Sequence, residues 1–263
     1  MSDDPATLLR RYDDQLRAHI HDRQPEGVTI ERDGPVLRMT GFGPGGWVLY
    51  RDLGGLDGAE LDAFIRRQVR HFAAEGMPFE WKLHGHDQPA DLPDRLRAAG
   101  FVPEEQETLL VAPLERLALD AEPPPGVVVR EVEGPADYDR IAALEAAVWA
   151  DDASVGWIEG LAEEQRADPE GTRVFLALAD DLAVSAGWIR FPSDTDFGTL
   201  WGGATRTEWR GRGIYRSLVA ARARLAAERR RRYLQVDASD DSRPILERLG
   251  FIPVAKTTPY IHR

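Results

Sequence analysis

The feature that most restricts the fold of this chain is a glycine-rich loop between a predicted strand and a predicted long helix. Residues 210–215 have the sequence Arg-Gly-Arg-Gly-Ile-Tyr, residues 199–205 before them have a strand pattern, and an apolar face at helical spacing follows. Backbone N–H groups in a first helical turn have no helical partner and attract anions. Glycines let a ligand approach the backbone, and arginines add charge-assisted hydrogen bonds. The loop therefore predicts a diphosphate site; a tight strand-to-helix turn without a ligand is the alternative.

Strand and helix patterns alternate from residue 127 onward, which predicts a mixed α/β sheet flanked by helices. The predicted strands cover residues 127–129, 174–178, 182–190, 199–205, 233–238 and 251–260, and the predicted helices lie around residue 141, at 153–166, after residue 213 and at 243–249. Three prolines at residues 123–125 cannot continue a helix or a sheet ladder. We therefore predict two domains, residues 1–121 and residues 126–263.

A repeated sequence motif, called the echo below, occurs once in each of the two predicted domains. Residues 99–103 (Ala-Gly-Phe-Val-Pro) match residues 249–253 (Leu-Gly-Phe-Ile-Pro) at an offset of 150 residues, and the short helices before them carry matched leucines, Leu96 and Leu246. The echo predicts two copies of one fold unit; chance recurrence of a common helix–glycine–strand element is the alternative. The glycines that stand at the loop position of the first copy, without its arginines, are Gly54, Gly55 and Gly58.

The composition excludes several classes of function. The net charge of -12 argues against a global nucleic-acid binder, and the absence of cysteine excludes disulfides, thiolate metal sites and a cysteine nucleophile. No stretch approaches the ~20 apolar residues that a membrane span needs. The acidic start lacks a secretory signal, so we expect a cytoplasmic protein without a nucleic-acid or membrane partner. The four arginines at residues 229–232 are interpreted as a solvated helix end or as a ligand-phosphate contact.

The glycine loop and the elements around it resemble the GNAT superfamily, the Gcn5-related N-acetyltransferases. The GNAT signature is Gln/Arg-x-x-Gly-x-Gly/Ala at a strand–helix junction, and its three fixed positions correspond here to Arg210, Gly213 and Tyr215, the last in place of a small residue. The resemblance covers roughly residues 126–263. The first half resembles a degenerate second copy, so the implied fold is two GNAT-like domains in tandem.

The resemblance implies that acetyl-CoA, or another acyl-CoA, is the co-substrate and that no metal is needed. The pantetheine arm would pair with the strand before the loop, and the pyrophosphate would meet the loop amides. The implied cofactor-binding residues are Ala204, Thr205, Arg206, Arg210, Gly211, Arg212, Gly213, Ile214 and Tyr215. An acceptor amine would attack the thioester directly, so catalysis would depend mainly on positioning.

Proton transfer is less well defined by the sequence. Many GNAT enzymes have a tyrosine acid where this chain has Leu246, so Tyr260 and Tyr215 are the candidate acids, each with a packed aromatic as the alternative. Candidate bases are Glu208, which is otherwise a solvated turn residue, and Asp237, which is otherwise a capping or salt-bridge residue. The predicted catalytic residues are therefore Tyr260, Glu208 and Asp237.

The acceptor pocket is expected on the first two helices of the second half, where GNAT folds usually build it. Acids among aromatic rings there would suit a cationic, partly apolar amine, and an acidic helix face beside core tryptophans is the alternative. The residues predicted to form this pocket are Glu145, Trp149, Asp152 and Trp157.

The leading hypothesis is therefore an acyl-CoA-dependent N-acyltransferase. It would most simply transfer acetyl to an amine of a small molecule or peptide in a ternary complex. The alternative is a catalytically inactive acyl-CoA-binding sensor or interaction module. The choice between a monomer and a homodimer is left open.

Overall fold

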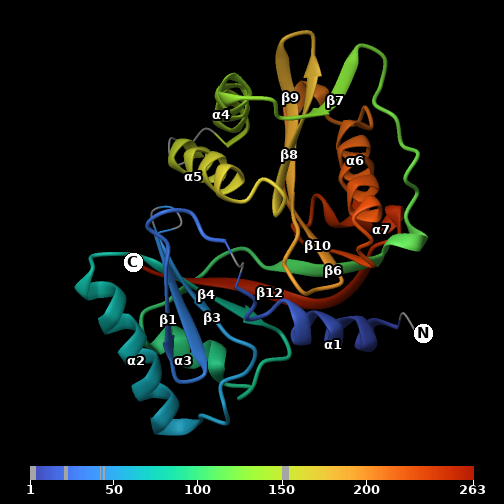
Figure 1. The fold of residues 1–263 in the computed structure, drawn as a ribbon. Helices are drawn as coiled ribbons and strands as arrows, with labels where there is room; N and C mark the ends of the chain where they lie inside the picture. The colour runs from blue at the N-terminus through green and yellow to red at the C-terminus, as the bar shows by residue number, and fades with distance from the viewer. Residues whose placement is uncertain (1–3, 21–22, 42, 44, 150–153) are drawn as a thin grey trace.

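The computed structural model describes residues 4–20, 23–41, 43, 45–149 and 154–263. Across these residues a single mixed sheet of twelve strands runs through both halves of the chain. Helices flank this sheet, so the predicted α/β class is confirmed. Figure 1 shows two lobes, with the first half below and most of the second half above.

The first half supplies the lower lobe. Its elements are α1 (Pro5–Gln15), β1 (Thr29–Asp33), β2 (Val36–Thr40), β3 (Gly46–Leu49), α2 (Gly58–Ala74), β4 (Phe79–His84), α3 (Leu92–Ala98), β5 (Val102–Pro103), β6 (Glu107–Pro113) and the 3-10 turn η1 (Leu114–Arg116). The helix α2 exists because Leu61, Phe64, Ile65 and Phe72 recur at helical spacing and are all buried.

The second half supplies the upper lobe. Its elements are β7 (Val127–Glu131), α4 (Pro135–Trp149), α5 (Ser154–Ala167), β8 (Thr172–Ala179), β9 (Leu182–Arg190), β10 (Phe197–Thr205), the 3-10 turn η2 (Thr207–Trp209), α6 (Ile214–Glu228), β11 (Tyr233–Ala238), α7 (Arg243–Leu249) and β12 (Ile252–His262). Helices α4 and α5 cover one face of β8 and β9, and α6 covers the other (Figure 1).

The two halves exchange their last strands. The strand order is β1-β2-β3-β4-β12-β6-β11-β10-β9-β8-β7. Strand β6 of the first half pairs with β11 of the second, and β12 of the second half pairs with β4 of the first. The two exchanged strands also pair with each other. The sheet therefore crosses the predicted domain boundary at residues 121–126 without interruption.

The echoed segments have the same local geometry. Phe101 N donates to Leu96 O and Phe251 N donates to Leu246 O, both at 3.1 Å. Gly100 and Gly250 both have left-handed backbone angles, with φ of 95° and 107°. Leu96 and Leu246 are both fully buried. Each motif ends a helix with a glycine turn and directs the chain into a strand.

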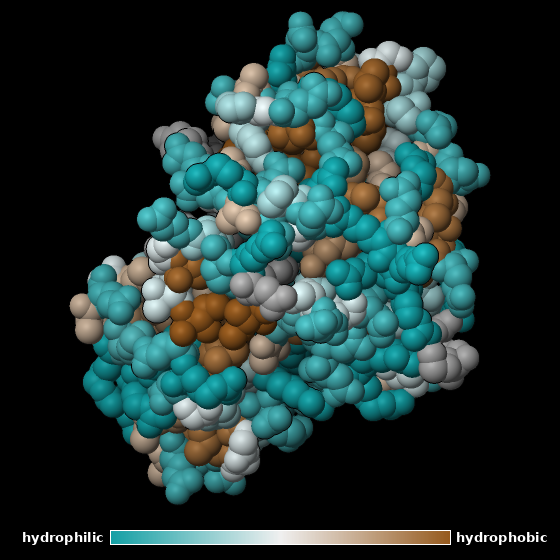
Figure 2. Space-filling view, viewed as in Figure 1, coloured by the Kyte–Doolittle hydropathy of each residue, from teal (hydrophilic) through white to brown (hydrophobic). Residues whose placement is uncertain are grey.

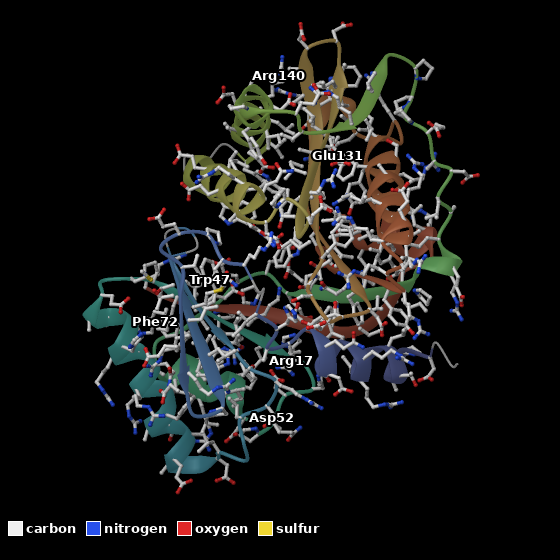
Figure 3. All side chains as sticks on the ribbon, viewed as in Figure 1. Arg17, Trp47, Asp52, Phe72, Glu131 and Arg140 are labelled. Carbon is white, nitrogen blue, oxygen red and sulfur yellow. The ribbon has the colours of Figure 1, made fainter. Side chains whose placement is uncertain are left out.

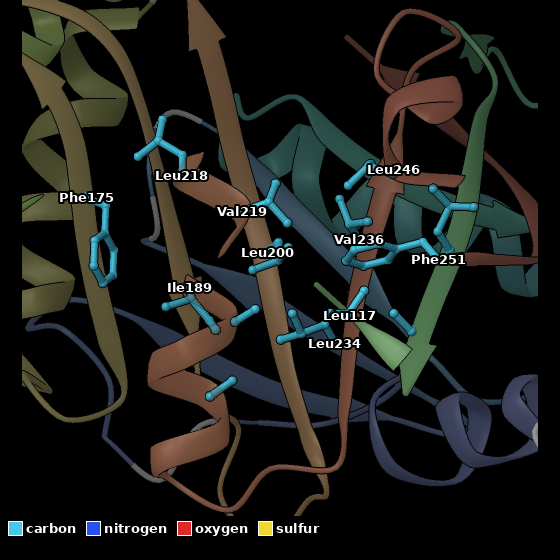
Figure 4. Packing of buried hydrophobic residues seen from close by; sticks show 14 of the residues in the cluster. Leu117, Phe175, Ile189, Leu200, Leu218, Val219, Leu234, Val236, Leu246 and Phe251 are labelled. Atoms are coloured by element: carbon cyan, nitrogen blue, oxygen red, sulfur yellow. The ribbon is translucent and has the colours of Figure 1, made fainter. Parts of the chain in front are cut away.

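The hydrophobic core is divided by the sheet. Figure 4 shows the cluster between the upper sheet and α6 and α7, which includes Ile189, Leu200, Leu218, Val219, Leu234, Val236, Leu246 and Phe251. A separate cluster lies between β4, α2 and α3 in the lower lobe. None of the described helices has both the length and the apolar character needed to cross a membrane.

The start of α4 is held by a buried ion pair that should contribute measurably to stability. Asp137 accepts hydrogen bonds from Arg130 Nη1 at 2.6 Å, Arg130 Nη2 at 2.8 Å and Glu133 N at 2.9 Å. The Arg130 hydrogen bonds lower the pKa of Asp137 from 3.8 to about 2. We expect Asp137→Asn to lower the free energy of unfolding by roughly 2 kcal/mol at pH 7 in urea titrations.

The pH dependence of this effect follows from the direction of the shift. A carboxylate with a lowered pKa stabilises the folded state above its unfolded pKa, and loses that contribution as the pH falls through the folded value. The difference between wild type and Asp137→Asn should therefore shrink between about pH 4 and pH 2. Asp139→Asn, on the exposed side of the same helix, is the matched control. An equal loss of stability in both variants would contradict the assignment.

Candidate active site

Strands β10 and β11 separate in the middle of the sheet. They are parallel and pair only at three positions, from Phe197 with Tyr233 to Thr199 with Gln235. Both strands continue beyond this point, β10 to Thr205 and β11 to Ala238. Among the described residues, the edge of β10 that faces β11 therefore has no strand partner from residue 200 onward, and the two strands separate there.

Two glycines shape β10 beside the point where these strands separate. Gly202 and Gly203 have φ of 69° and 121°, at a bulge in the pairing of β10 with β9. A Cβ on Gly202 would lie 2.3 Å from the Trp188 ring, and one on Gly203 would lie 3.0 Å from Tyr215 Cε2. Both the backbone angle and the close approach therefore require glycine. Gly203 also explains how the large Tyr215 is accommodated at a position where the GNAT signature has a small residue.

The predicted glycine loop lies directly before α6. Gly213 is the N-cap residue in a left-handed conformation with φ of 86°, and no side chain caps the helix start within the described structure. The hydrogen bond from Ser217 N to Gly213 O, at 3.0 Å, is the first along the helix. The amides of Ile214, Tyr215 and Arg216 therefore have no helical acceptor, which is the arrangement expected of an anion site.

The remaining residues predicted for the cofactor lie around this helix start. Arg210 and Arg212 are exposed. Arg210 Nε donates to Thr205 O at 3.1 Å, and the Arg212 guanidinium lies 4.6 Å from the centre of the Trp209 ring. Ile214 is buried and anchors the first turn in the core. Ala204, Thr205 and Arg206 end β10 and its turn. The fold thus gathers the nine predicted residues along one strand end and one loop.

A buried arginine that the sequence analysis did not single out ties α6 to the bulge. Arg222 is 1% exposed, and its Nη1 donates to Trp188 O and Trp201 O, each at 3.1 Å. Burial lowers the pKa of its guanidinium to about 10. Arg222 holds β9 and β10 together at the bulge, next to the point where β10 parts from β11. The arginine run at residues 229–232 lies at the other end of α6, where Arg229 pairs with Glu170 at 2.7 Å.

A cavity of about 510 Å³ lies where the two lobes meet. We call it the junction cavity. Its lining includes Tyr12, Trp47, Tyr50, Glu80, Lys82, His84 and Glu107 from the first half, and Trp157, Glu164, Asp168, Arg190, Thr199, Trp201, Gln235 and Asp237 from the second. Because Thr199 and Gln235 form the last pair of β10 with β11, the cavity reaches the point where these strands separate.

Charged side chains from three strands meet in the junction cavity. Lys82 Nζ of β4 donates to Asp237 Oδ2 of β11 at 2.9 Å and to Glu107 Oε2 of β6 at 3.2 Å. Thr257 Oγ1 donates to Asp237 Oδ1 at 3.3 Å. Burial alone would raise the pKa of Asp237, but the charge and hydrogen bond of Lys82 outweigh it and hold the pKa below its usual value. Asp237 is therefore an ionised carboxylate and a weak base.

The three predicted catalytic residues lie in different places. Asp237 lines the junction cavity. Glu208 is exposed in η2, beside the glycine loop. Tyr260 is 2% exposed and packs in the lower-lobe core, where it pairs in register with Trp81. Since side chains alternate along a strand, Tyr260 and Trp81 lie on the face of the sheet opposite to Lys82. Only Asp237 of the three is placed at the cavity.

The predicted acceptor residues are also divided. Trp157 lines the junction cavity, with its ring 5.0 Å from that of Trp188. Glu145 and Trp149 are on α4 and are not part of the cavity lining; burial raises the pKa of Glu145, and Trp149 is 63% exposed. Asp152 lies outside the described residues. Within the described ranges, no group of three or more histidine or carboxylate side chains is placed to hold a metal ion.

Besides Arg222, the charged cavity residues around Asp237 that sequence reasoning missed come from the first half. Glu80, Lys82 and Glu107 contribute to the cavity wall, and α1 adds Tyr12. One signal was present in the sequence. Strand β4 (Phe-Glu-Trp-Lys-Leu-His) alternates apolar and polar residues, so its charged side chains share one face. The partner of that face, on β11, was not predictable from the local pattern.

The glycine turn before α2 in the first half corresponds to the glycine loop before α6, but more carboxylates than guanidiniums surround it. The glycine turn before α2 lies at a cavity of about 650 Å³ whose lining includes the carboxylates of Asp13, Asp14, Asp52, Asp57 and Asp87 and the guanidiniums of Arg10, Arg17 and Arg51. Asp52 Oδ1 already accepts from Gly54 N at 2.8 Å. Arg17 is paired with Asp87 at 2.6 Å. The five carboxylates outnumber the three guanidiniums of this lining, which disfavours a diphosphate.

Known structures share this architecture. A GCN5-related N-acetyltransferase from Kribbella flavida has a TM-score of 0.66 and 17% identity, covering 97% of this chain and 93% of that chain. A tandem GNAT protein from the clavulanic acid biosynthesis pathway has a TM-score of 0.61 and 14% identity, covering 91% and 84%. A GCN5-related N-acetyltransferase from Sphaerobacter thermophilus has a TM-score of 0.62 and 14% identity, covering 89% and 75%. The chain therefore has a GNAT fold.

The second half also carries a sequence match. Residues 138–251 match the sequence model of the family described as Acetyltransferase (GNAT) family. The match extends from α4 to the residue after α7's glycine stop, so it includes the separated strands and the glycine loop. No curated protein sequence matches this chain.

Proposed function

We propose that this protein is an acyl-CoA-dependent N-acyltransferase that transfers acetyl from acetyl-CoA to an amine of a small molecule. The proposal depends mainly on the separation of β10 from β11. The start of α6, which no side chain caps in the described structure, lies at one end of this separation, and the junction cavity lies at the other. The family match of residues 138–251 supports the same class of reaction. In this proposal the first half, residues 1–121, is a degenerate copy that does not bind CoA.

Each part of the site has a defined task in this proposal. The amides at the start of α6 hold the diphosphate, with Arg210 and Arg212 adding positive charge. The unpaired edge of β10 offers backbone groups to the amides of the pantetheine arm. The acceptor nitrogen, as the free amine, reaches the thioester carbon from the junction cavity and a C–N bond forms. The C–S bond breaks, and the proton lost from nitrogen goes to the departing CoA thiolate. Positioning of the two reactants supplies most of the rate enhancement.

Asp237 has a binding task in this scheme. Its carboxylate is kept ionised by Lys82, so it attracts the ammonium form of an acceptor. The bound ammonium group must release one proton to solvent before its nitrogen can attack the thioester. The buried Leu246, at the position where many GNAT enzymes have an acidic tyrosine, motivates a second candidate function. In that case the protein binds acyl-CoA without turnover and acts as a sensor or interaction module.

Calorimetry with acetyl-CoA tests the shared part of both candidates. We expect saturable binding of one acetyl-CoA per chain, because the first half presents carboxylates at its glycine turn. A hundredfold excess over the dissociation constant should stabilise the fold by about 2.7 kcal/mol. Release of free thiol in the presence of amines then separates the enzyme from the binding module. Absence of any binding heat would refute both, and two sites per chain would refute the proposed degeneracy of the first half.

A further inference from the structure

The junction cavity has the position of an acceptor site for the proposed acyl transfer. Thr199 and Gln235 connect it to the point where β10 and β11 part, and Trp157 closes it from α5. The first half forms the other wall. Figure 3 shows Trp47 at the end of the lower lobe that faces the upper lobe. A volume of about 510 Å³ falls within the range of small-molecule pockets.

The carboxyl groups that line the junction cavity near Lys82 outnumber the ammonium group available to them. Glu107 and Asp237 share the ammonium group of Lys82, and Glu80, two residues from Lys82 on β4, lines the same cavity as a third carboxyl group. The carboxyl group of Glu80 has no hydrogen bond or ion pair with the residues that the structure describes. Burial raises the pKa of its carboxyl group. The nearby charge of Lys82 offsets only part of the desolvation of this side chain, and the neighbouring carboxylates oppose its ionisation.

The cations elsewhere in the wall are already engaged. Arg190 Nε contacts Glu164 Oε1 at 2.6 Å, and Arg17 Nη1 contacts Asp87 Oδ1 at 2.6 Å. Burial lowers the pKa of His84 to about 4, so its ring is neutral at pH 7. Arg23 lines the cavity only at its exposed rim. The interior of the cavity thus holds three carboxyl groups beside one ammonium group, and a cationic ligand would stabilise the ionised form of all three.

Aromatic rings make up much of the remaining wall. Trp47 from β3, Trp157 from α5 and Trp201 from β10 line the same space, and Trp201 is 40% exposed toward it and the solvent. Beside them, Figure 2 shows an apolar area on the lower lobe close to the junction, on an otherwise largely hydrophilic face. Tryptophan ranks as slightly hydrophilic on the hydropathy scale of the figure, so other side chains supply this area. Flat indole surfaces bind planar apolar groups and attract cations.

We propose that the acceptor is a small cationic amine on a flat apolar body, and that Glu80 and Trp47 of the first half determine this specificity. The inference rests on the proposed acyl transfer. The ammonium group lies among Glu80, Glu107 and Asp237, and the apolar body lies between the indoles. The first half thus serves as one wall of the acceptor site.

Two matched amines test the charge requirement. 2-Phenylethylamine and phenylalanine share the ring and the amino group, but the second adds a carboxylate. Thiol release from acetyl-CoA should show kcat/KM at least about tenfold higher for 2-phenylethylamine, since an unfavourable charge contact costs about 1.4 kcal/mol or more. Quenching of tryptophan fluorescence by each amine, with CoA present, measures binding without turnover.

Glu80→Gln tests the contribution of the first half. We expect its KM for 2-phenylethylamine to rise about tenfold, with the KM for acetyl-CoA unchanged, because the loop of the second half is untouched. Glu105→Gln, an exposed glutamate of the same half, is the control and should leave both constants unchanged. Circular dichroism and thermal melting verify that both variants are folded.

The failures of the two proposals are distinguishable. If acetyl-CoA binds but 2-phenylethylamine neither quenches fluorescence nor reacts, or if phenylalanine is the better acceptor, the specificity inference is overturned and CoA binding stands. Unchanged KM values in a folded Glu80→Gln variant overturn the role of the first half. A chain that binds no acetyl-CoA removes the proposed function on which the inference rests.

Discussion

Replacing Gly213 by aspartate is expected to weaken acetyl-CoA binding about 100-fold while the chain stays folded. Gly213 is the N-cap residue of α6, and a Cβ built there comes no closer than 3.5 Å to Arg216 Nη2, so the larger side chain has room. Its carboxylate would compete for the free amides of the first turn and repel the diphosphate. The left-handed φ of 86° adds a conformational cost of at most about 1–2 kcal/mol, which the fold should tolerate. The loss of binding should appear in calorimetric titration of acetyl-CoA, with circular dichroism verifying that the variant is folded.

Gly213→Asn separates charge from shape in this experiment. Asparagine has nearly the same size as aspartate and tolerates the same left-handed conformation, which Gly213 adopts with φ of 86°. Because it lacks the negative charge, we expect it to weaken binding less than about tenfold. Equal losses for the two variants would show that backbone geometry, and not anion binding, is what the loop requires.

Gly202→Ala should cause the largest loss of stability among single glycine substitutions on β10. The residue has φ of 69°, and its new Cβ would lie 2.3 Å from the Trp188 ring. Trp188 is itself buried and its ring lies 5.0 Å from that of Trp157, so moving it would disturb existing packing. The conformational cost of about 1–2 kcal/mol and the overpacking cost of about 1–3 kcal/mol combine to roughly 3 kcal/mol. Thermal unfolding should record a drop of about 6–12 °C.

Gly55→Ala is the matched control for this substitution. Gly55 also has a left-handed backbone, with φ of 79°, but nothing lies within 4 Å of a Cβ built on it. The Gly55→Ala variant should therefore lose only the conformational contribution to the free energy of unfolding, about 1–2 kcal/mol. Similar losses at the two glycines would mean that the Trp188 contact adds nothing. The comparison isolates the effect of packing beside the point where β10 and β11 separate.

Much of the second half could be predicted because its signals are local. Strand β9 (Leu182–Arg190), β11 (Tyr233–Ala238) and α7 (Arg243–Leu249) have the bounds that the sequence pattern predicts. Alternation identifies the strands, and Gly250 ends α7 with a left-handed turn. The glycine loop follows the same logic, since the helix start and the glycines that precede it are neighbours in the chain.

What could not be predicted depends on contacts between distant segments. The partner of Lys82 is Asp237, which is 155 residues away, and their contact depends on the exchange of β6 and β12. Strand pairing is decided by tertiary packing, so no local pattern assigns β6 to β11. For the same reason Tyr260 could be considered as a proton donor, whereas the register of β12 with β4 places it in the lower-lobe core.

The exchanged strands also constrain how the protein is made. During synthesis β4 leaves the ribosome long before β12, its sheet neighbour at residues 252–262. The edge of β4 that later pairs with β12 therefore stays unpaired until the end of the chain has been made. Such edges invite pairing with other nascent chains, and contacts of such long sequence separation form slowly. The two lobes therefore reach their native state together and late, and we expect neither to be recovered as an independently folding unit when the chain is cut at residue 121.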